Sequence, residues 1–240
     1  MRARVLIHGG GKMGRRLRAA LTESHEFELA ALIAQPRPDG LPDDAWFPTL
    51  AECDTDADLL IDFTLTGGPE VAARWCAGHR VPLLSGTTAL SDADEAALQH
   101  LAKQVPVMWA PNLSYGIALM NALVRSAAGA LGGDAGIHVT ETHHVHKLDA
   151  PSGTALALAE TADEARQHAG DSDAITFTSI REGEVVGEHT MSFSFGDEVL
   201  EITHKALDRD IFVHGALKAG QWLVKQPPGF YSTRDWLAVD

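Results

Sequence analysis

The residues with the clearest chemical potential lie between positions 138 and 154. Four histidines crowd the first part of this segment: His138, His143, His144 and His146. His143 and Lys147 are titratable groups close together in the sequence, and such groups can exchange protons with a bound substrate. Ser152-Gly153-Thr154 follows as a helix start, whose backbone N–H groups and hydroxyls can receive a carboxylate or a phosphate. The segment therefore predicts an acid–base site for a small dianion.

Two other interpretations of the histidine cluster stay open. On an extended strand, His144 and His146 would share one face and could ligate a metal ion. No conspicuous set of cysteine or carboxylate ligands accompanies them, so we expect no metal. One or two of the imidazoles could also be hydrogen-bonded core groups that take no part in chemistry.

A glycine-rich turn near the N-terminus predicts dinucleotide binding. The run Gly9-Gly10-Gly11-Lys12-Met13-Gly14 follows an apolar strand and opens a helix, and it fits G-x-G-x-x-G through its first, third and sixth residues. The first glycine permits a tight turn, the second lets the backbone approach a pyrophosphate, and the third lets the helix pack on the strand. Any tight turn between a strand and a helix would also favour glycine, with or without a ligand.

The choice of dinucleotide depends on the residues after the second predicted strand. NAD-selective sites place an Asp or Glu about 20 residues after the glycine turn. Here Ala34-Gln35-Pro36-Arg37 offers no carboxylate before Asp39. This removes one reason to reject a 2′-phosphate, which Lys12 or Arg37 could receive, although Arg37 could equally be a solvated loop residue. We expect both NADPH and NADH to bind, with NADPH at least as good.

Two further polar loops follow predicted strands. They are Ser85-Gly86-Thr87-Thr88 and Ala110-Pro111-Asn112-Leu113-Ser114. In doubly wound sheets, ligands bind beyond the carboxyl ends of the strands, so both loops are well placed for a cofactor. Either loop alone would be ordinary turn chemistry.

The elements that must position these residues change character near residue 113. The first half alternates apolar strands with helices, which is typical of βαβ units: strands at 5–7, 29–34, 59–61, 81–84 and 105–109, and helices at 12–23, 69–76 and 92–103. The second half alternates apolar and polar residues, as in a sheet with one wet or partner-covered face: strands at 138–142, 175–180, 189–195 and 200–203, and helices at 117–129, 155–168 and 215–225.

We therefore predict an α/β protein with two domains. A Rossmann-type dinucleotide-binding domain with a parallel sheet would comprise residues 1–113 plus 216–240. An α+β domain for substrate binding and oligomerisation, built on an open mixed sheet, would be inserted over residues 114–215.

Composition excludes several other classes. With 45% hydrophobic and 22% charged residues, the 240-residue chain can bury a core. Nineteen Lys and Arg against 33 Asp and Glu give a net charge of −14, which disfavours nucleic-acid and membrane-surface partners. No apolar run reaches about 18 residues, and no signal-peptide core follows the start, so we expect a cytoplasmic protein. Cys53 and Cys76 lack metal-ligand spacing and are expected to be free thiols.

Several motifs resemble those of the dihydrodipicolinate reductase family. Residues 143–155 fit H-H-x-x-K-x-D-x-P-S-G-T-A, which resembles the signature of that family. The glycine turn from Gly11 to Gly14 and the two polar loops are similar to its cofactor loops. In the second half, the similar segments are Arg181-Glu182-Gly183, Val186-Gly187-Glu188-His189-Thr190 and Glu201-Ile202-Thr203-His204-Lys205-Ala206. The resemblance therefore covers nearly the whole chain.

The resemblance implies an NAD(P)H-dependent reduction of a cyclic imine-type substrate to tetrahydrodipicolinate, in the diaminopimelate route to lysine. It implies that Lys147 donates a proton and that His143 donates or accepts one. His144 would contact the substrate dicarboxylate, and the turn Ser152-Gly153-Thr154 would bind one of its carboxylates. The implied cofactor residues are Gly9, Gly10, Gly11, Lys12, Met13, Gly14, Gly86, Thr87, Thr88, Ala110, Pro111, Asn112 and Leu113. The family is typically a homotetramer assembled through the sheets of the substrate domain.

Two positions depart from the family pattern. His8 stands where the family has a leading glycine, so Gly9 would begin a turn that is one residue shorter. Ala34-Gln35 stand where members often carry an acidic residue. Two rival functions from other classes are a metal-dependent hydrolase that uses His143, His144 and His146, and a non-catalytic NAD(P)-binding sensor.

Overall fold

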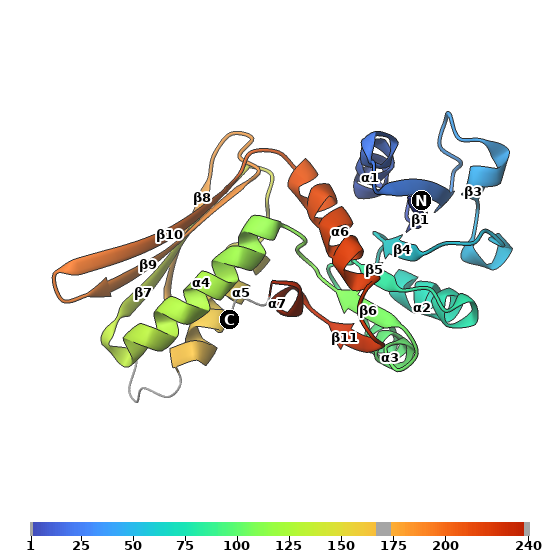
Figure 1. Cartoon of the computed structure of the whole chain (residues 1–240). Helices are drawn as coiled ribbons and strands as arrows, with labels where there is room; N and C mark the ends of the chain where they lie inside the picture. Colours follow the sequence, from blue (N-terminus) through green and yellow to red (C-terminus); the bar gives the residue numbers. More distant parts are fainter. Residues whose placement is uncertain (1, 167–173, 238–240) are drawn as a thin grey trace. The chain divides into compact units, whose positions relative to one another are not determined.

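The computed structural model describes residues 2–166 and 174–237. These residues form two compact units, which are described separately (Figure 1). Unit 1 comprises residues 2–113 and 212–237, and unit 2 comprises the described residues between 114 and 211. Among the helices of the described residues, none combines the length and the apolarity that a bilayer crossing requires.

Unit 1 contains a seven-stranded parallel sheet with the order β11-β6-β5-β4-β1-β2-β3. From β3 to β6 this is the usual strand order of dinucleotide-binding folds. The strands are β1 (Ala3–His8), β2 (Phe27–Ile33), β3 (Trp46–Phe47), β4 (Leu59–Asp62), β5 (Leu83–Ser85), β6 (Pro106–Trp109) and β11 (Gly229–Tyr231). The helices are α1 (Lys12–Glu23), α2 (Gly68–His79), α3 (Asp92–Leu101), α6 (Asp210–Leu223) and α7 (Thr233–Trp236).

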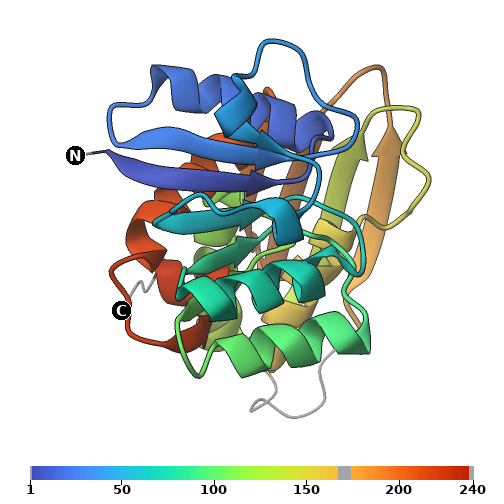
Figure 2. The same ribbon diagram turned by 90° about the vertical axis from the view of Figure 1, so that its right-hand side faces the viewer.

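Both faces of this sheet are covered, because successive strand residues point to opposite sides. Val5 and Ile7 of β1 pack with α1 and α6, whereas Leu6 packs on the other face with α2 and α3. In Figure 2 the helices α2 and α3 lie side by side on that second face. The continuous apolar runs of the sequence are thus strands that are buried on both faces.

Unit 2 contains a mixed four-stranded sheet with the order β10-β9-β7-β8, in which only β7 and β8 are parallel. Its strands are β7 (Gly136–His143), β8 (Thr176–Arg181), β9 (Gly187–Phe195) and β10 (Glu198–Ala206), and its helices are α4 (Tyr115–Leu131) and α5 (Gly153–Arg166). Val139, Met191 and Phe193 point from the sheet into a core with both helices. The opposite face of the sheet carries mainly hydroxyl and charged side chains.

The predicted parallel sheet and the predicted separate mixed sheet are both confirmed. The sequence analysis missed β3, β11 and α7, because none of these short elements contains a run of three apolar residues or a helical repeat. The predicted strand at 81–84 begins only at Leu83, since Pro82 has no backbone N–H for the ladder. The predicted helix at 155–168 begins at Gly153, and its last two residues lie outside the described residues. The predicted helix at 215–225 begins at Asp210.

The chain re-enters unit 1 at Phe212, whereas the sequence analysis placed the return at residue 216. The earlier return reflects Val213, which is buried in the core of unit 1. Ser91 caps the start of α3: its hydroxyl accepts a hydrogen bond from Asp94 N, and the Asp94 carboxylate accepts one from Ser91 N.

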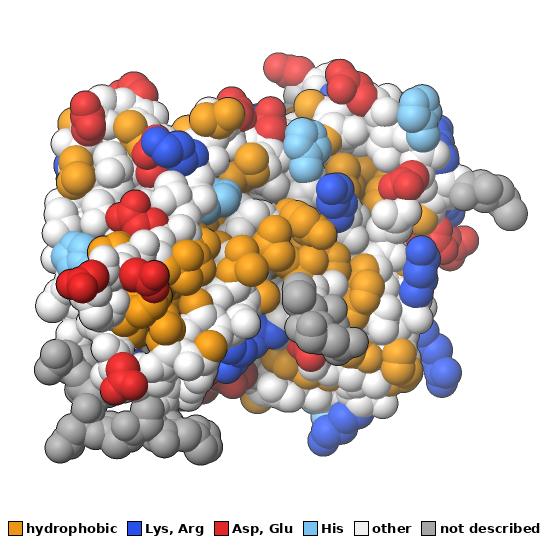
Figure 3. Space-filling model, turned by 60° about the vertical axis from the view of Figure 1, so that its left-hand side comes forward, with side chains coloured by type: hydrophobic (Ala, Val, Ile, Leu, Met, Phe, Trp, Pro, Cys, Tyr) orange, Lys and Arg blue, Asp and Glu red, His pale blue; other side chains and the backbone are white. Residues whose placement is uncertain are grey.

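Among the described residues, the face that Figure 3 shows has no large patch of charges of a single sign. Acidic and basic side chains are interspersed there. The large exposed hydrophobic residues of the described chain include Tyr115, Leu119 and Leu123 of α4.

Candidate active site

The glycine turn after β1 needs two of its glycines for packing alone. Gly9 has a φ of +115°, a conformation that L side chains rarely adopt, and a Cβ there would lie 2.6 Å from the carbonyl oxygen of Phe63. A Cβ at Gly14 would lie 1.8 Å from the carbonyl oxygen of Gly9. The helix α1 can therefore approach β1 this closely only because Gly14 has no side chain.

Gly11 is constrained differently. It is the exposed N-cap of α1, and no heavy atom of the described residues lies within 4 Å of where its Cβ would be. No side chain of residues 2–166 or 174–237 caps this helix, and its first turn has no acidic residue. The N–H groups of this turn and the helix dipole can therefore hold a phosphate. The open backbone at Gly11 fits the pyrophosphate of a dinucleotide.

The predicted cofactor segments follow the carboxyl ends of strands β1, β5 and β6, all at one edge of the parallel sheet in unit 1. The glycine turn follows β1, residues 86–88 follow β5, and residues 110–113 follow β6. Gly86 N donates to the carbonyl of Asp62 at 2.8 Å, and Ala110 N donates to the carbonyl of Ser85 at 2.9 Å. This edge of a doubly wound sheet is where ligands bind.

A buried carboxylate, which the sequence analysis did not single out, ties these loops together. Asp62 accepts hydrogen bonds from the hydroxyls of Thr64 (2.6 Å), Ser85 (2.8 Å) and Thr87 (2.9 Å). His8 Nδ1, at the end of β1, lies 3.0 Å from Asp62 Oδ1. The available signal was a single acidic residue closing the apolar run at 59–61.

Arg37 lies in the loop after β2, where its guanidinium already has partners. It donates to the carbonyl of Leu41 at 2.6 Å, pairs with Asp43 at 2.6 Å, and lies 5.4 Å from the ring centroid of Trp46. Trp46 Nε1 in turn donates to the carbonyl of Ala34 at 2.9 Å. The ring therefore anchors the arginine near the end of β2, although Asp43 competes for its charge.

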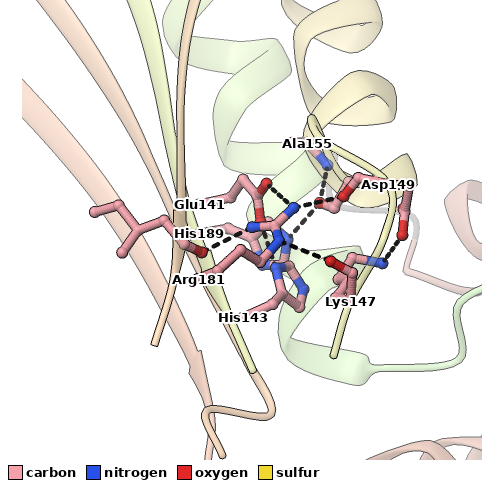
Figure 4. A network of polar contacts seen from close by, with 9 residues as sticks. Glu141, His143, Lys147, Asp149, Ala155, Arg181 and His189 are labelled. Atoms are coloured by element: carbon pink, nitrogen blue, oxygen red, sulfur yellow. Dashed lines mark hydrogen bonds and ion pairs between the residues drawn. The ribbon is translucent and has the colours of Figure 1, made fainter. Parts of the chain in front are cut away.

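In unit 2, the end of β7 presents the second predicted cluster (Figure 4). Glu141 and His143 are two residues apart on the strand, so both point to the inner face, where both are buried. His143 Nδ1 is hydrogen-bonded to Glu141 Oε2, and Arg181 Nη2 donates to Glu141 Oε1 at 2.9 Å. The parallel pairing of β7 with β8 places Arg181 directly beside His143.

The charges of this cluster are set by burial and by these partners. Burial lowers the pKa of His143; Glu141 raises that pKa, while Lys147 and Arg181 lower it, and the net shift is downwards. Burial alone would raise the pKa of Glu141, but hydrogen bonds from Arg181, Ser179 and His143 hold it below its usual range. At neutral pH the pair is therefore a neutral imidazole that donates Nδ1–H to an ionised carboxylate.

Lys147 lies in the loop between β7 and α5. Its Nζ is 2.8 Å from the carboxylate of Asp149. Hydrogen bonds from Lys147 and from the backbone of Gly153 lower the pKa of Asp149, with burial acting in the opposite direction. The Asp149 carboxylate thus interacts with both the ammonium group of Lys147 and the backbone at the start of α5. The same two groups are suited to bind the carboxylate of a ligand.

A second buried histidine, His189, lies at the start of α5. Ser152 Oγ accepts a hydrogen bond from Ala155 N at 3.2 Å and lies 3.2 Å from His189 Nε2. Burial, with the nearby His143 as the next cause, lowers the pKa of His189 to about 4, so this imidazole is neutral at physiological pH. The ring of His189 meets that of His143 edge to face, with centroids 5.1 Å apart.

The remaining predicted residues lie on the same loop. His144 follows the end of β7, and its ring is 6.2 Å from that of His146. The strand ends at His143, so the two later histidines do not share a strand face as the metal interpretation required. Among the described residues, no group of three or more His, Cys, Asp or Glu is arranged to hold a metal ion.

Both halves of the chain match family models. Residues 3–113 match the N-terminus of dihydrodipicolinate reductase, and residues 116–237 match its C-terminus. The chain is 40% identical over 239 residues to the 4-hydroxy-tetrahydrodipicolinate reductase of Xanthomonas euvesicatoria pv. vesicatoria, covering 97% of this chain and 96% of the relative. It is 43% identical over 198 residues to that of Halorhodospira halophila, covering 76% and 74%.

Solved structures share the fold. A dipicolinate-bound dihydrodipicolinate reductase from Paenisporosarcina sp. TG-14 matches with a TM-score of 0.82 at 23% identity, over 99% of this chain and 100% of that one. An amine dehydrogenase from Mycobacterium smegmatis matches with a TM-score of 0.66 at 12% identity, over 96% and 95%. The chain therefore belongs to the dihydrodipicolinate reductase family, the NADH- or NADPH-dependent oxidoreductases that act as 4-hydroxy-tetrahydrodipicolinate reductases in lysine and diaminopimelate biosynthesis.

Proposed function

We propose that the chain reduces a small cyclic dicarboxylate, with Lys147 as the proton donor and His143 as the partner that donates or accepts a proton. The observation that carries this assignment is the cluster at the end of β7. There the buried imidazole of His143 is oriented by Glu141, and the loop that follows the strand carries the ammonium group of Lys147. The nicotinamide supplies the hydride when it is bound. A conjugated imine then needs a proton to quench the developing negative charge, and a positioned acid contributes roughly 10²–10⁴-fold.

The substrate carboxylates are assigned to the start of α5. Ser152 directly precedes α5, and Gly153 and Thr154 begin its first turn, whose N–H groups favour anions; His144 completes the site. The relative from Paenisporosarcina sp. TG-14 is described with dipicolinate, a dicarboxylate, bound to it. Holding the ring by its carboxylates orients it for hydride transfer, which can contribute as much as the proton.

The cofactor is assigned to unit 1, which we take as the dinucleotide-binding domain, and the substrate to unit 2. The glycine turn would bind the pyrophosphate, because its backbone at Gly11 is open and the start of α1 is uncapped by any described side chain. The complete set of assigned cofactor residues is Gly9, Gly10, Gly11, Lys12, Met13, Gly14, Gly86, Thr87, Thr88, Ala110, Pro111, Asn112 and Leu113.

We also assign a homotetramer, assembled through the outer face of the unit 2 sheet, in the cytoplasm. Side chains on that face are largely paired with one another: Thr190 with Thr203 at 2.9 Å, Ser192 with Glu201 at 3.1 Å, and Lys205 with Glu188 at 2.8 Å. A face with its charges already neutralised, and with Ile180 and Val199 exposed on the neighbouring strands, can be covered at low desolvation cost.

Two variants test the assigned roles. Lys147→Ala should lose mainly turnover, by roughly 10²–10⁴-fold, because an acid acts in the transition state. Thr154→Ala should raise mainly the Michaelis constant, because a carboxylate receptor also binds the ground state. The measurement is NADPH oxidation with substrate generated by a synthase in the same cuvette. Unchanged turnover in Lys147→Ala, with only a raised Michaelis constant, would contradict the role of Lys147.

A further inference from the structure

The Glu141 carboxylate accepts hydrogen bonds from two side chains, His143 on its own strand and Arg181 on β8. One oxygen holds His143 Nδ1, and the other accepts from Arg181 Nη2 at 2.9 Å. Glu141 is buried, and burying an ionised carboxylate is costly unless it is paired and hydrogen-bonded. The hydrogen bond from Arg181 therefore stabilises Glu141 in its ionised form, in which it can accept a hydrogen bond from the imidazole of His143.

Arg181 also holds the loop that carries Lys147. Its Nε donates to the carbonyl of Lys147 at 3.3 Å, and its Nη2 donates to the carbonyl of Asp149. Nη1 donates to the carbonyl of Ile180 at 2.7 Å, which fixes the guanidinium to its own strand. One side chain thus fastens the loop at two carbonyls on either side of Leu148 (Figure 4).

Backbone hydrogen bonds also join the residues after Arg181 to His143 and the loop that follows it. Glu182 N donates to the carbonyl of His143 at 2.8 Å, and Val145 N donates to the carbonyl of Gly183 at 3.2 Å. The ring of His143 is also confined from β9, because a Cβ at Gly187 would lie 3.0 Å from Nε2. The chain therefore sets the position of His143 from three strands at once.

We propose that Arg181 and Glu141 are positioning residues that hold His143 and Lys147 in one fixed arrangement, so that the two groups act as a unit. Glu141 selects the tautomer with the proton on Nδ1, which leaves Nε2 to exchange protons with the substrate. Arg181 fixes the backbone from which the Lys147 side chain extends. This inference rests on the proposed function, since it gives a purpose to the two residues assigned there.

The tautomer is measurable without turnover. In ¹⁵N NMR spectra of the whole protein, wild-type His143 should show a protonated Nδ1 and an unprotonated Nε2 above its pKa. Glu141→Gln should mix the tautomers and lower the pKa of His143, whereas Arg181→Gln should raise it, because a nearby positive charge is removed. The other charged or titratable groups that face this ring are Lys147 and His189. A wild-type tautomer and pKa in a folded Glu141→Gln variant would overturn the proposal.

Kinetics test the link to Lys147. Arg181→Gln should lower kcat by about 10²-fold, since misplacement by about 1 Å can cost that much, and Arg181→Lys should recover only part of it. In a Lys147→Ala background, Arg181→Gln should lower kcat by clearly less than it does alone, because the part of its effect that acts through Lys147 is gone. Additive losses would overturn the proposal.

A matched control is Arg125→Gln, which breaks an exposed Arg–Glu pair with Glu164 at 3.0 Å in the same unit. It should leave kcat and the His143 tautomer unchanged. Failure of the proposed function is distinguishable from failure of the positioning pair. The first would appear as wild-type turnover in Lys147→Ala, and the second as a wild-type tautomer in Glu141→Gln.

Discussion

Arg37, at the end of β2, has its guanidinium beside an aromatic ring, a carbonyl oxygen and a carboxylate. The ring and the carbonyl hold the group in the loop after β2, the segment that contacts the ribose in dinucleotide-binding folds, and Asp43 offsets part of its charge. A 2′-phosphate would therefore have to compete with Asp43, which limits how strongly this residue can favour NADPH.

We expect Arg37→Ala to weaken NADPH binding by no more than about fivefold, about 1 kcal/mol, and to leave NADH binding unchanged. The effect should shrink at high salt, because charges in this solvent-accessible loop are screened: the side chain of Arg37 is 39% exposed and that of Asp43 is 94% exposed. Fluorescence titrations of both reduced cofactors measure this, with the exposed Arg74→Ala of α2 as the control. A tenfold preference for NADH (about 1.4 kcal/mol) that is insensitive to Arg37→Ala would show that another group selects the cofactor.

At the scale of elements, the junction of β1 with α1 separates packing from binding. A Cβ at Gly14 meets the carbonyl of Gly9 at 1.8 Å, whereas a Cβ at Gly11 meets no described atom within 4 Å. Gly14→Ala should therefore lower the melting temperature or prevent folding. Gly11→Ala should keep nearly the wild-type melting temperature and weaken cofactor binding by at least about tenfold. Thermal unfolding and cofactor titration check both, and tight cofactor binding by Gly11→Ala would contradict the assigned pyrophosphate site.

The starts of α2 and α3 share one buried carboxylate. Asp94 accepts hydrogen bonds from Gly67 N at 2.9 Å, Glu70 N at 3.0 Å and Ser91 N at 3.0 Å. Burial alone would raise the pKa of Asp94, but the hydrogen bonds from Ser91, Gly67 and Glu70 lower it to about 2. One side chain thus joins two helices.

We expect Asp94→Ala to lower the free energy of unfolding by about 1–3 kcal/mol, because it leaves buried N–H groups without an acceptor. The folded-state pKa lies below the usual value, so this stability is present above about pH 4 and is lost as the pH falls towards 2. Urea unfolding at several pH values measures it. Asp92→Ala, in the same turn but exposed, is the control and should cost only a few tenths of a kcal/mol.

At the scale of the whole molecule, the outer face of the unit 2 sheet should decide the assembly. Thr190 lies on β9, which is an inner strand of that sheet, and its hydroxyl is 2.9 Å from that of Thr203. Thr190→Arg would place an unpaired charge at the centre of the proposed interface, so we expect tetramers to dissociate. Sedimentation velocity measures this, with Ala19→Arg on the exposed side of α1 as the control. A Thr190→Arg variant that stays tetrameric would assign the interface to another surface.

Much of the fold and part of the site follow from local sequence. The alternation of apolar runs with helical segments predicted five of the seven strands in the parallel sheet, because each of these buried strands is a continuous apolar run that can be read locally. The glycine turn and the run from His143 to Thr154 were equally local. Glu141 and His143 are two residues apart, so their shared face could also be read from the sequence.

What remained was decided by pairing between distant segments. Arg181 lies 40 residues from Glu141, and only the parallel register of β7 with β8 brings its guanidinium to that carboxylate. Asp62 acquires its role because β1, β4 and β5 are neighbours, which surrounds it with hydroxyls from other loops. Sequence spacing determines which residues share a face within one element. Contacts between elements depend on strand order and register, which the burial of the whole core selects.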